Sequence, residues 1–146
     1  SFISSTYWTE RIGPTAALST IRKHKRNNVP KHLIKMGKRV QSEWKSTAER
    51  HGLRVSISGI PPLGHFSFDY ENSQAIRTLF TQEMLQKGFL ATDSFYVSYA
   101  HQNHHIESYS RAVDETFAFI AKAIEDNKIS KLLKGPVAHS GFRRLA

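Results

Sequence analysis

The sequence predicts an α+β fold, in which helices cover a small and mainly antiparallel sheet of three to four strands. Three observations lead to this prediction. Two segments with helical periodicity come first, at 12–26 and from residue 30 onward. Two short segments of alternating apolar and polar residues follow within 53–70, which is the period of paired strands. A further helix, one more strand and a long final helix come next, in that order.

The first two helices carry most of the positive charge. The net charge is +9, and residues 11–54 alone hold twelve basic residues against two acidic ones. The second helix is predicted to begin near Pro30 and to stop at Gly52. Its apolar residues are Leu33, Met36, Val40 and Trp44, and its lysines are Lys31, Lys35, Lys38 and Lys45. Because the two sets lie about 180° apart on a helix, we interpret the lysines as a solvated face. A phosphate-binding stripe is the alternative.

A hairpin is predicted after the second helix. Apolar residues alternate with polar ones from Leu53 to Ile57 and again from Phe66 to Tyr70. The connection at 59–64 is rich in Gly and Pro, which mark turns. An antiparallel pair with a somewhat long turn is therefore expected.

The second half of the chain predicts a helix, a strand and another helix. The first of these helices begins near Asn72 or Ser73 and stops at Gly88. A polar break at 92–94 precedes a strand that carries Phe95, Val97 and Tyr99 on one face. The last long helix has the clearest apolar stripe, with one more turn expected at 129–133. The stripe is Ile106, Tyr109, Val113, Phe117, Ile120 and Ile124.

Composition narrows the class of protein. A length of 146 residues with 39% hydrophobic residues fits one globular domain with one core. No segment approaches the roughly 18 apolar residues of a membrane-spanning helix, and no signal peptide opens the chain. We therefore expect a cytoplasmic protein with no membrane partner. The absence of cysteine excludes disulfides, thiolate metal sites and a cysteine nucleophile.

Three groups of residues are candidates for chemistry. Small hydroxyl residues at 4–6 precede a helix, where they could hold an anion or simply cap the helix. Asp93 lies in the polar break and is either a carboxylate in a cleft or a turn former. His101, His104 and His105 are close in sequence, but adjacent positions at a helix start point in different directions, which favours a surface turn over a metal site.

The opening segment resembles a segment of class III aminotransferases, the family that includes glutamate-1-semialdehyde 2,1-aminomutase. The stretch is Ser-Ser-Thr-Tyr-Trp-Thr-Glu-Arg-Ile-Gly-Pro-Thr-Ala-Ala-Leu-Ser-Thr-Ile at 4–21. Thr6 matches a threonine that, in that family, binds the phosphate of pyridoxal 5'-phosphate (PLP) in the neighbouring subunit. The resemblance implies that Thr6, with Ser5, completes the partner's site in a homodimer. Glu10 and Arg11 depart from the Asn-Pro common in the family, which puts the amino acceptor in doubt.

A second match lies at 84–101, where Met-Leu-Gln-Lys-Gly is followed by Phe-Tyr-Val-Ser-Tyr-Ala-His. It is similar to the family's last strand of the small domain, which runs past the substrate pocket. Asp93 falls where the aminomutase branch has a glutamate, so the resemblance implies that Asp93 and Phe95 are substrate-binding residues. The tail at 135–144 is similar to a branch associated with unusual sugar or polysaccharide precursors.

The resemblance implies the small C-terminal domain of a fold-type I PLP enzyme. In this interpretation residues 1–28 are a phosphate loop and connecting helix, and residues 29–146 are a small α/β domain. The chain does not begin with Met, and no lysine matches the family's catalytic lysine motif. We therefore expect a portion of a longer PLP-dependent transaminase or aminomutase that is inactive alone, with no catalytic residue, no metal ligand and no nucleic-acid partner in this chain. A basic nucleic-acid-binding module and an inert interaction domain are the alternatives.

Overall fold

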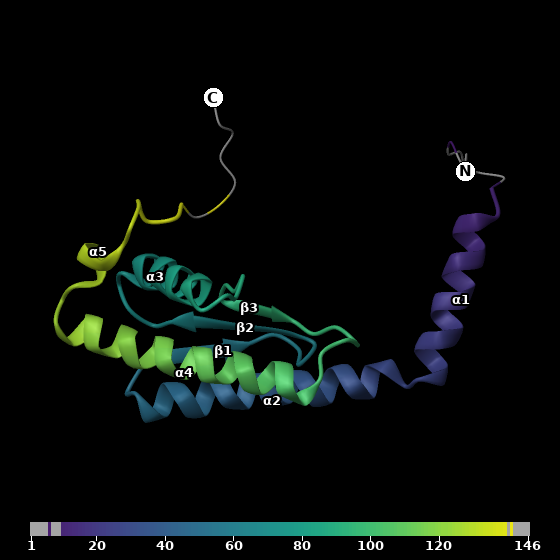
Figure 1. Cartoon of the computed structure of the whole chain (residues 1–146), viewed down its shortest axis with the longest axis horizontal. Helices are drawn as coiled ribbons and strands as arrows, with labels where there is room; N and C mark the ends of the chain where they lie inside the picture. Colours follow the sequence, from purple (N-terminus) through teal and green to yellow (C-terminus); the bar gives the residue numbers. More distant parts are fainter. Residues whose placement is uncertain (1–5, 7–9, 140, 142–146) are drawn as a thin grey trace. The chain divides into compact units, whose positions relative to one another are not determined.

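The computed structural model describes residues 6, 10–139 and 141 (Figure 1). The helices and strands are α1 Ile12–Arg26, α2 Val29–Arg50, β1 Val55–Ser58, β2 Leu63–Phe68, α3 Ser73–Gln86, β3 Ser94–Tyr96, α4 Asn103–Glu125 and α5 Ile129–Leu132. The chain divides into two compact units, one up to His32 and one from Leu33 onward. The α+β fold predicted from the sequence is confirmed.

Helix α1 has the predicted bounds, and none of its residues is buried. The side chain of Glu10 occupies its first turn: the backbone N–H of Ile12 donates to Glu10 Oε1 at 2.6 Å, and that of Gly13 donates to Glu10 Oε2 at 3.3 Å. A carboxylate at this end of a helix is also favoured by the helix dipole. The predicted apolar residues Ile12 and Ile21 remain 78% and 63% exposed.

Helix α2 turns its apolar stripe inward, as predicted. Met36, Val40 and Trp44 are at most 3% exposed. Lys35, Lys38 and Lys45 are all exposed, as expected for the solvated face of an amphipathic helix. Gly52 follows the helix with a φ of 66°, a conformation that favours glycine and ends the helix as predicted.

The sheet has three antiparallel strands in the order β1, β2, β3. The predicted bounds of β2 were wrong: the strand runs from Leu63 to Phe68 and ends before Tyr70. The turn is shorter than expected because the N–H of Leu63 donates to the carbonyl of Ile60 at 2.8 Å, and Gly59 adopts a φ of 80°. Leu63 and Gly64 pair with Tyr96 and Phe95 of β3, so the strand begins three residues earlier than the alternation alone indicated.

Strand β3 is also shorter than predicted. It ends at Tyr96, although the N–H of Val97 still donates to the carbonyl of Pro62 at 3.0 Å. Tyr99 lies in a turn that is closed by the N–H of His101 and the carbonyl of Ser98 at 3.1 Å. This turn removes the last part of the predicted strand from the sheet.

Helices α3 and α4 confirm the predictions for the second half. Gly88 follows α3 with a φ of 85°. Five of the six predicted stripe residues of α4 are buried, and Ile124 is partly buried. The short helix α5 covers 129–132 of the predicted 129–133.

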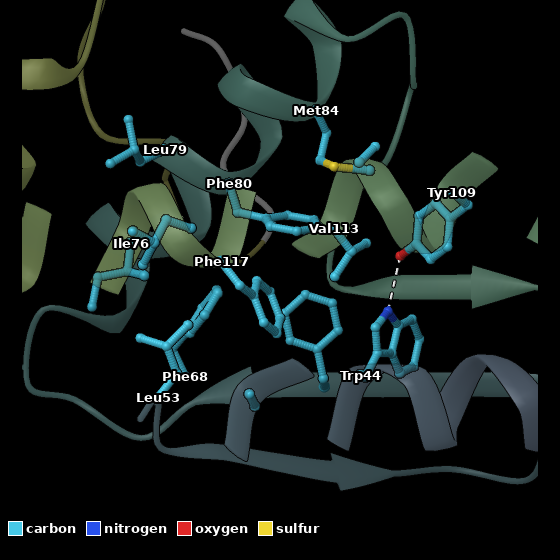
Figure 2. Close-up of a cluster of buried hydrophobic side chains, with 14 of the residues drawn as sticks. Trp44, Leu53, Phe68, Ile76, Leu79, Phe80, Met84, Tyr109, Val113 and Phe117 are labelled. Atoms are coloured by element: carbon cyan, nitrogen blue, oxygen red, sulfur yellow. Dashed lines mark hydrogen bonds between the residues drawn. The ribbon is translucent and has the colours of Figure 1, made fainter. Parts of the chain in front are cut away.

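One ring lies at the centre of the core. Phe66 of β2 contacts Trp44 of α2, Phe80 of α3 and Phe117 of α4, with ring centroids 5.0, 5.2 and 5.8 Å away. Figure 2 shows the side chains of Trp44, Phe80 and Phe117 in this core. All four rings are at most 2% exposed. In β2, Gly64, Phe66 and Phe68 are buried while Leu63 and Ser67 are exposed, so these three helices pack on one face of the sheet.

The hairpin turn also touches the backbone of α2. A Cβ atom placed on Gly37 would lie 1.8 Å from the carbonyl oxygen of Pro61 and 2.3 Å from its carbon. Only a residue without a side chain permits this approach of turn to helix.

Candidate functional site

Asp93 lies just before β3 and is held from two sides. Its carbonyl accepts the N–H of Phe66 at 2.9 Å, which fixes its backbone to β2. Its carboxylate Oδ2 accepts a hydrogen bond from Arg77 Nη1 of α3 at 3.2 Å. The two side chains are 28% and 37% exposed, so the ion pair is reached by solvent. The pair lines an open hollow of about 180 Å³ with Phe66, Ser67, Phe68, Ser73 and Gln74.

Phe95 lines a different hollow, of about 220 Å³. Its ring lies 4.9 Å from that of Tyr109 and 5.1 Å from that of His101, measured between centroids. The other lining residues are Phe89, Leu90, Ala91, Ser94 and Tyr96. The two predicted substrate-binding residues are therefore close in sequence but open into separate hollows.

Tyr109, which lines the hollow of Phe95, is held by a buried hydrogen bond. Trp44 Nε1–H of α2 donates to the hydroxyl oxygen of Tyr109 of α4 at 3.0 Å, shown as the dashed line in Figure 2. Burial raises the pKa of the Tyr109 hydroxyl well above its ordinary value, because a tyrosinate could not be solvated there.

We expect Tyr109→Phe to lower the free energy of unfolding by about 1–2 kcal/mol, because it leaves the buried indole N–H without its acceptor. The difference in the free energy of unfolding between the wild-type protein and Tyr109→Phe should shrink above pH 10. The pKa of Tyr109 is higher in the folded chain than in the unfolded chain, so unfolding releases a proton there and wild-type stability falls as pH rises. Urea unfolding of both proteins at neutral and alkaline pH measures this. A gap that is unchanged or widens with pH would contradict it.

The histidines at the start of α4 bind backbone groups. His101 Nδ1 accepts the N–H of Ser98 at 2.9 Å, and His105 Nδ1 accepts the N–H of Gln102 at 3.1 Å. Within the described part of the chain, no three His, Cys, Asp or Glu side chains gather as they would around a metal ion. The histidines thus order the connection from β3 to α4.

Thr6 is exposed in a turn before α1, and Ser5 lies outside the described residues. A phosphate here could use the Thr6 hydroxyl. The N–H groups of Ile12 and Gly13 in the first turn of α1 are already bound by Glu10. Among these residues, the Thr6 hydroxyl can therefore donate a hydrogen bond to a phosphate. The N–H groups of Ile12 and Gly13 cannot, because Glu10 already binds them.

Two features of the site were missed by sequence reasoning. Arg77 was not singled out, because its pairing with Asp93 joins a helix to the segment before β3, sixteen residues away. The polar residues Gln74, Thr78 and Gln82 were also missed, although their spacing of four residues places them on one face of α3. That spacing was the signal available in the sequence.

Ser94 and His65 also meet, with Ser94 Oγ 2.8 Å from His65 Nδ1. The carboxylate of Asp93 lies 3.4 Å from Ser94 Oγ. Asp93 is thus placed beside the hydroxyl and does not orient the imidazole as the acid of a nucleophile–base–acid arrangement would. The contact between Ser94 and His65 links β3 to β2.

The described residues contain no helix long and apolar enough to cross a membrane. No protein-family model matches the sequence. No curated protein matches it either.

Solved structures do match the fold. The chain is similar to the FumI protein of Sphingopyxis sp. MTA144 in its PLP internal aldimine form, with a TM-score of 0.75 and 18% identity over 91% of this chain. It is also similar to an omega-transaminase from Sphaerobacter thermophilus, with a TM-score of 0.70 and 13% identity over 84% of this chain. The chain spans 33% and 31% of the lengths of those two chains. It has the fold of a part of a PLP-dependent aminotransferase.

Proposed function

We propose that this chain is the C-terminal part of a PLP-dependent transaminase or aminomutase that moves an amino group on an amino or keto compound. The observation that carries the proposal is the fold match, since more than four fifths of the chain superposes on each of two such proteins. Sequence motifs at 4–21 and 84–101 point to the same enzymes. The tail motif favours a sugar or polysaccharide precursor as the substrate.

PLP would supply the electron sink for the reaction, and this chain would supply binding groups. The Thr6 hydroxyl, with Ser5, donates to the phosphate bound in the neighbouring subunit of a homodimer. Asp93 accepts a hydrogen bond from the amine or a hydroxyl of the substrate, while Arg77 orients its carboxylate. Phe95 forms an apolar wall of the neighbouring hollow and excludes water there.

The test uses the full-length protein. We expect a yellow protein with an absorbance band that borohydride removes, and a dimer by sedimentation. Thr6→Val should weaken PLP binding about ten- to hundredfold, since a hydrogen bond to a charged group contributes about 1.5–3 kcal/mol. Thr6→Ser should retain most of the affinity, because it keeps the hydroxyl.

Thr20→Val is the matched control, because Thr20 is an exposed threonine of α1. A full-length protein that takes up no PLP would overturn the proposed function. Equal PLP affinities for Thr6→Val and Thr20→Val would remove the phosphate role of Thr6 alone. Full PLP affinity in a monomer would remove the role across the interface.

A further inference from the structure

The residues after α5 contact α3, and we call residues 133–139 the strap. They form no helix or strand. They are nevertheless held at both ends by side chains of α3.

The first attachment is the amide of Gln82. Its Nε2 donates to the carbonyl of Leu132 at 3.0 Å, and its Oε1 accepts the N–H of Lys134 at 2.8 Å. One side chain thus binds both a donor and an acceptor of the backbone. This is the pairing that a neighbouring strand would otherwise provide.

The second attachment is a pair of residues one and two turns earlier in α3. Thr78 Oγ1 accepts the N–H of Ala138 at 3.1 Å, and Gln74 Nε2 donates to the carbonyl of Ala138 at 2.7 Å. The Thr78 hydroxyl also donates to the carbonyl of Gln74 at 2.7 Å. Again the backbone is bound through both of its groups, so the side chains of the strap are not required for docking.

The three α3 residues form a ladder of known direction. Gln82, Thr78 and Gln74 are spaced by four, so the strap runs antiparallel to α3 toward the N-terminal end of that helix. Gln74 also lines the hollow that contains Asp93 and Arg77. The last attachment of the strap is therefore a residue of the candidate substrate pocket.

We propose that the strap docks on this ladder and fixes Gln74 in the Asp93 hollow, which makes Gln74 and the strap positioning elements for the substrate. The docking follows from the contacts alone, while the role in substrate binding rests on the proposed function. An undocked strap would leave the Gln74 amide free to rotate, and the polar wall of the hollow would lose its defined arrangement.

Hydrogen exchange of the full-length protein tests the docking without any cofactor. We expect the amides of Lys134 and Ala138 to be protected, and Gln82→Ala to speed their exchange about five- to tenfold. Gln86→Ala is the matched control: it removes the same side chain from the next turn of α3, where the amide of Gln86 binds only Glu83 of its own helix among the described residues. Trypsin should cut after Lys134 faster in Gln82→Ala than in Gln86→Ala.

The substrate role is tested on the PLP-loaded full-length protein with L-glutamate, L-alanine and 4-aminobutyrate as amino donors. For the donor that reacts fastest, Gln82→Ala and Gln74→Ala should raise KM several-fold and leave kcat and PLP affinity within twofold of wild type. Gln86→Ala should change none of these quantities.

Each outcome has a separate meaning. Exchange of Lys134 and Ala138 as fast as in an unfolded peptide, or equal exchange in the Gln82 and Gln86 variants, overturns the docking. Faster exchange with an unchanged KM overturns the positioning role. A holoenzyme that reacts with none of the three amines counts against the proposed function, and the exchange result still decides the docking.

Discussion

Replacing Phe66 with alanine is expected to lower the free energy of unfolding by about 3–5 kcal/mol, the range for truncating a buried aromatic residue. Phe66 is 2% exposed and its ring packs edge-on against rings from α2, α3 and α4. Its removal leaves a cavity that borders all three helices, so packing is lost on each of them. Urea unfolding followed by tryptophan fluorescence measures the loss.

Phe119→Ala provides the control, because Phe119 lies on α4 and is 39% exposed. Its truncation should cost well under half as much, since less apolar area returns to water. Comparable losses for the two variants would show that Phe66 is not the centre of the core.

The sequence was sufficient for α2 and α4 because each has a long apolar stripe that is buried in the fold. Six positions in α4 and four in α2 recur at helical spacing, and burial of the stripes sets both the type and the orientation of each helix. Gly52 and Gly88 mark helix ends because their positive φ values are unfavourable for other residues. These properties depend on nearby residues alone, so they can be predicted from a single sequence.

Strand bounds could not be predicted in the same way. Leu63 begins β2 because it pairs with Tyr96 of β3, a contact that alternation does not encode. Tyr99 continues the alternation of β3 but lies in a turn at Ser98 that is stabilised by the ring of His101. Pairing partners decide where a strand ends.

The candidate site was predicted only in part. Resemblance singled out Asp93 and Phe95, and the structure places Asp93 just before β3 and Phe95 within it. It could not show that they face separate hollows, nor that Asp93 pairs with Arg77, because both facts depend on the packing of α3 against β2. The ladder on α3 was not predicted for the same reason, since the backbone groups that it binds lie about 50–64 residues further along the chain.

Gly37→Ala is expected to lower the free energy of unfolding by about 3 kcal/mol, although Gly→Ala substitutions in helices usually raise it. In the interior of a helix, Gly→Ala normally stabilises by about 1 kcal/mol, because alanine has the better helix propensity. Here the new methyl group would lie 1.8 Å from the carbonyl oxygen of Pro61, and the obstacle is backbone rather than a flexible side chain. Relief requires the hairpin turn to move away from α2.

That movement would carry β2 with it, because the turn is tied to the strand through Ile60 and Leu63. Hydrogen exchange should therefore increase in the hairpin as well as in α2, whereas Ser42→Ala, at an exposed position of the same helix, should be neutral or slightly stabilising. If Gly37→Ala raises the unfolding midpoint as Ser42→Ala does, the close packing of the turn on α2 is wrong. If it lowers the midpoint but exchange changes only in α2, the turn and β2 do not move as one unit.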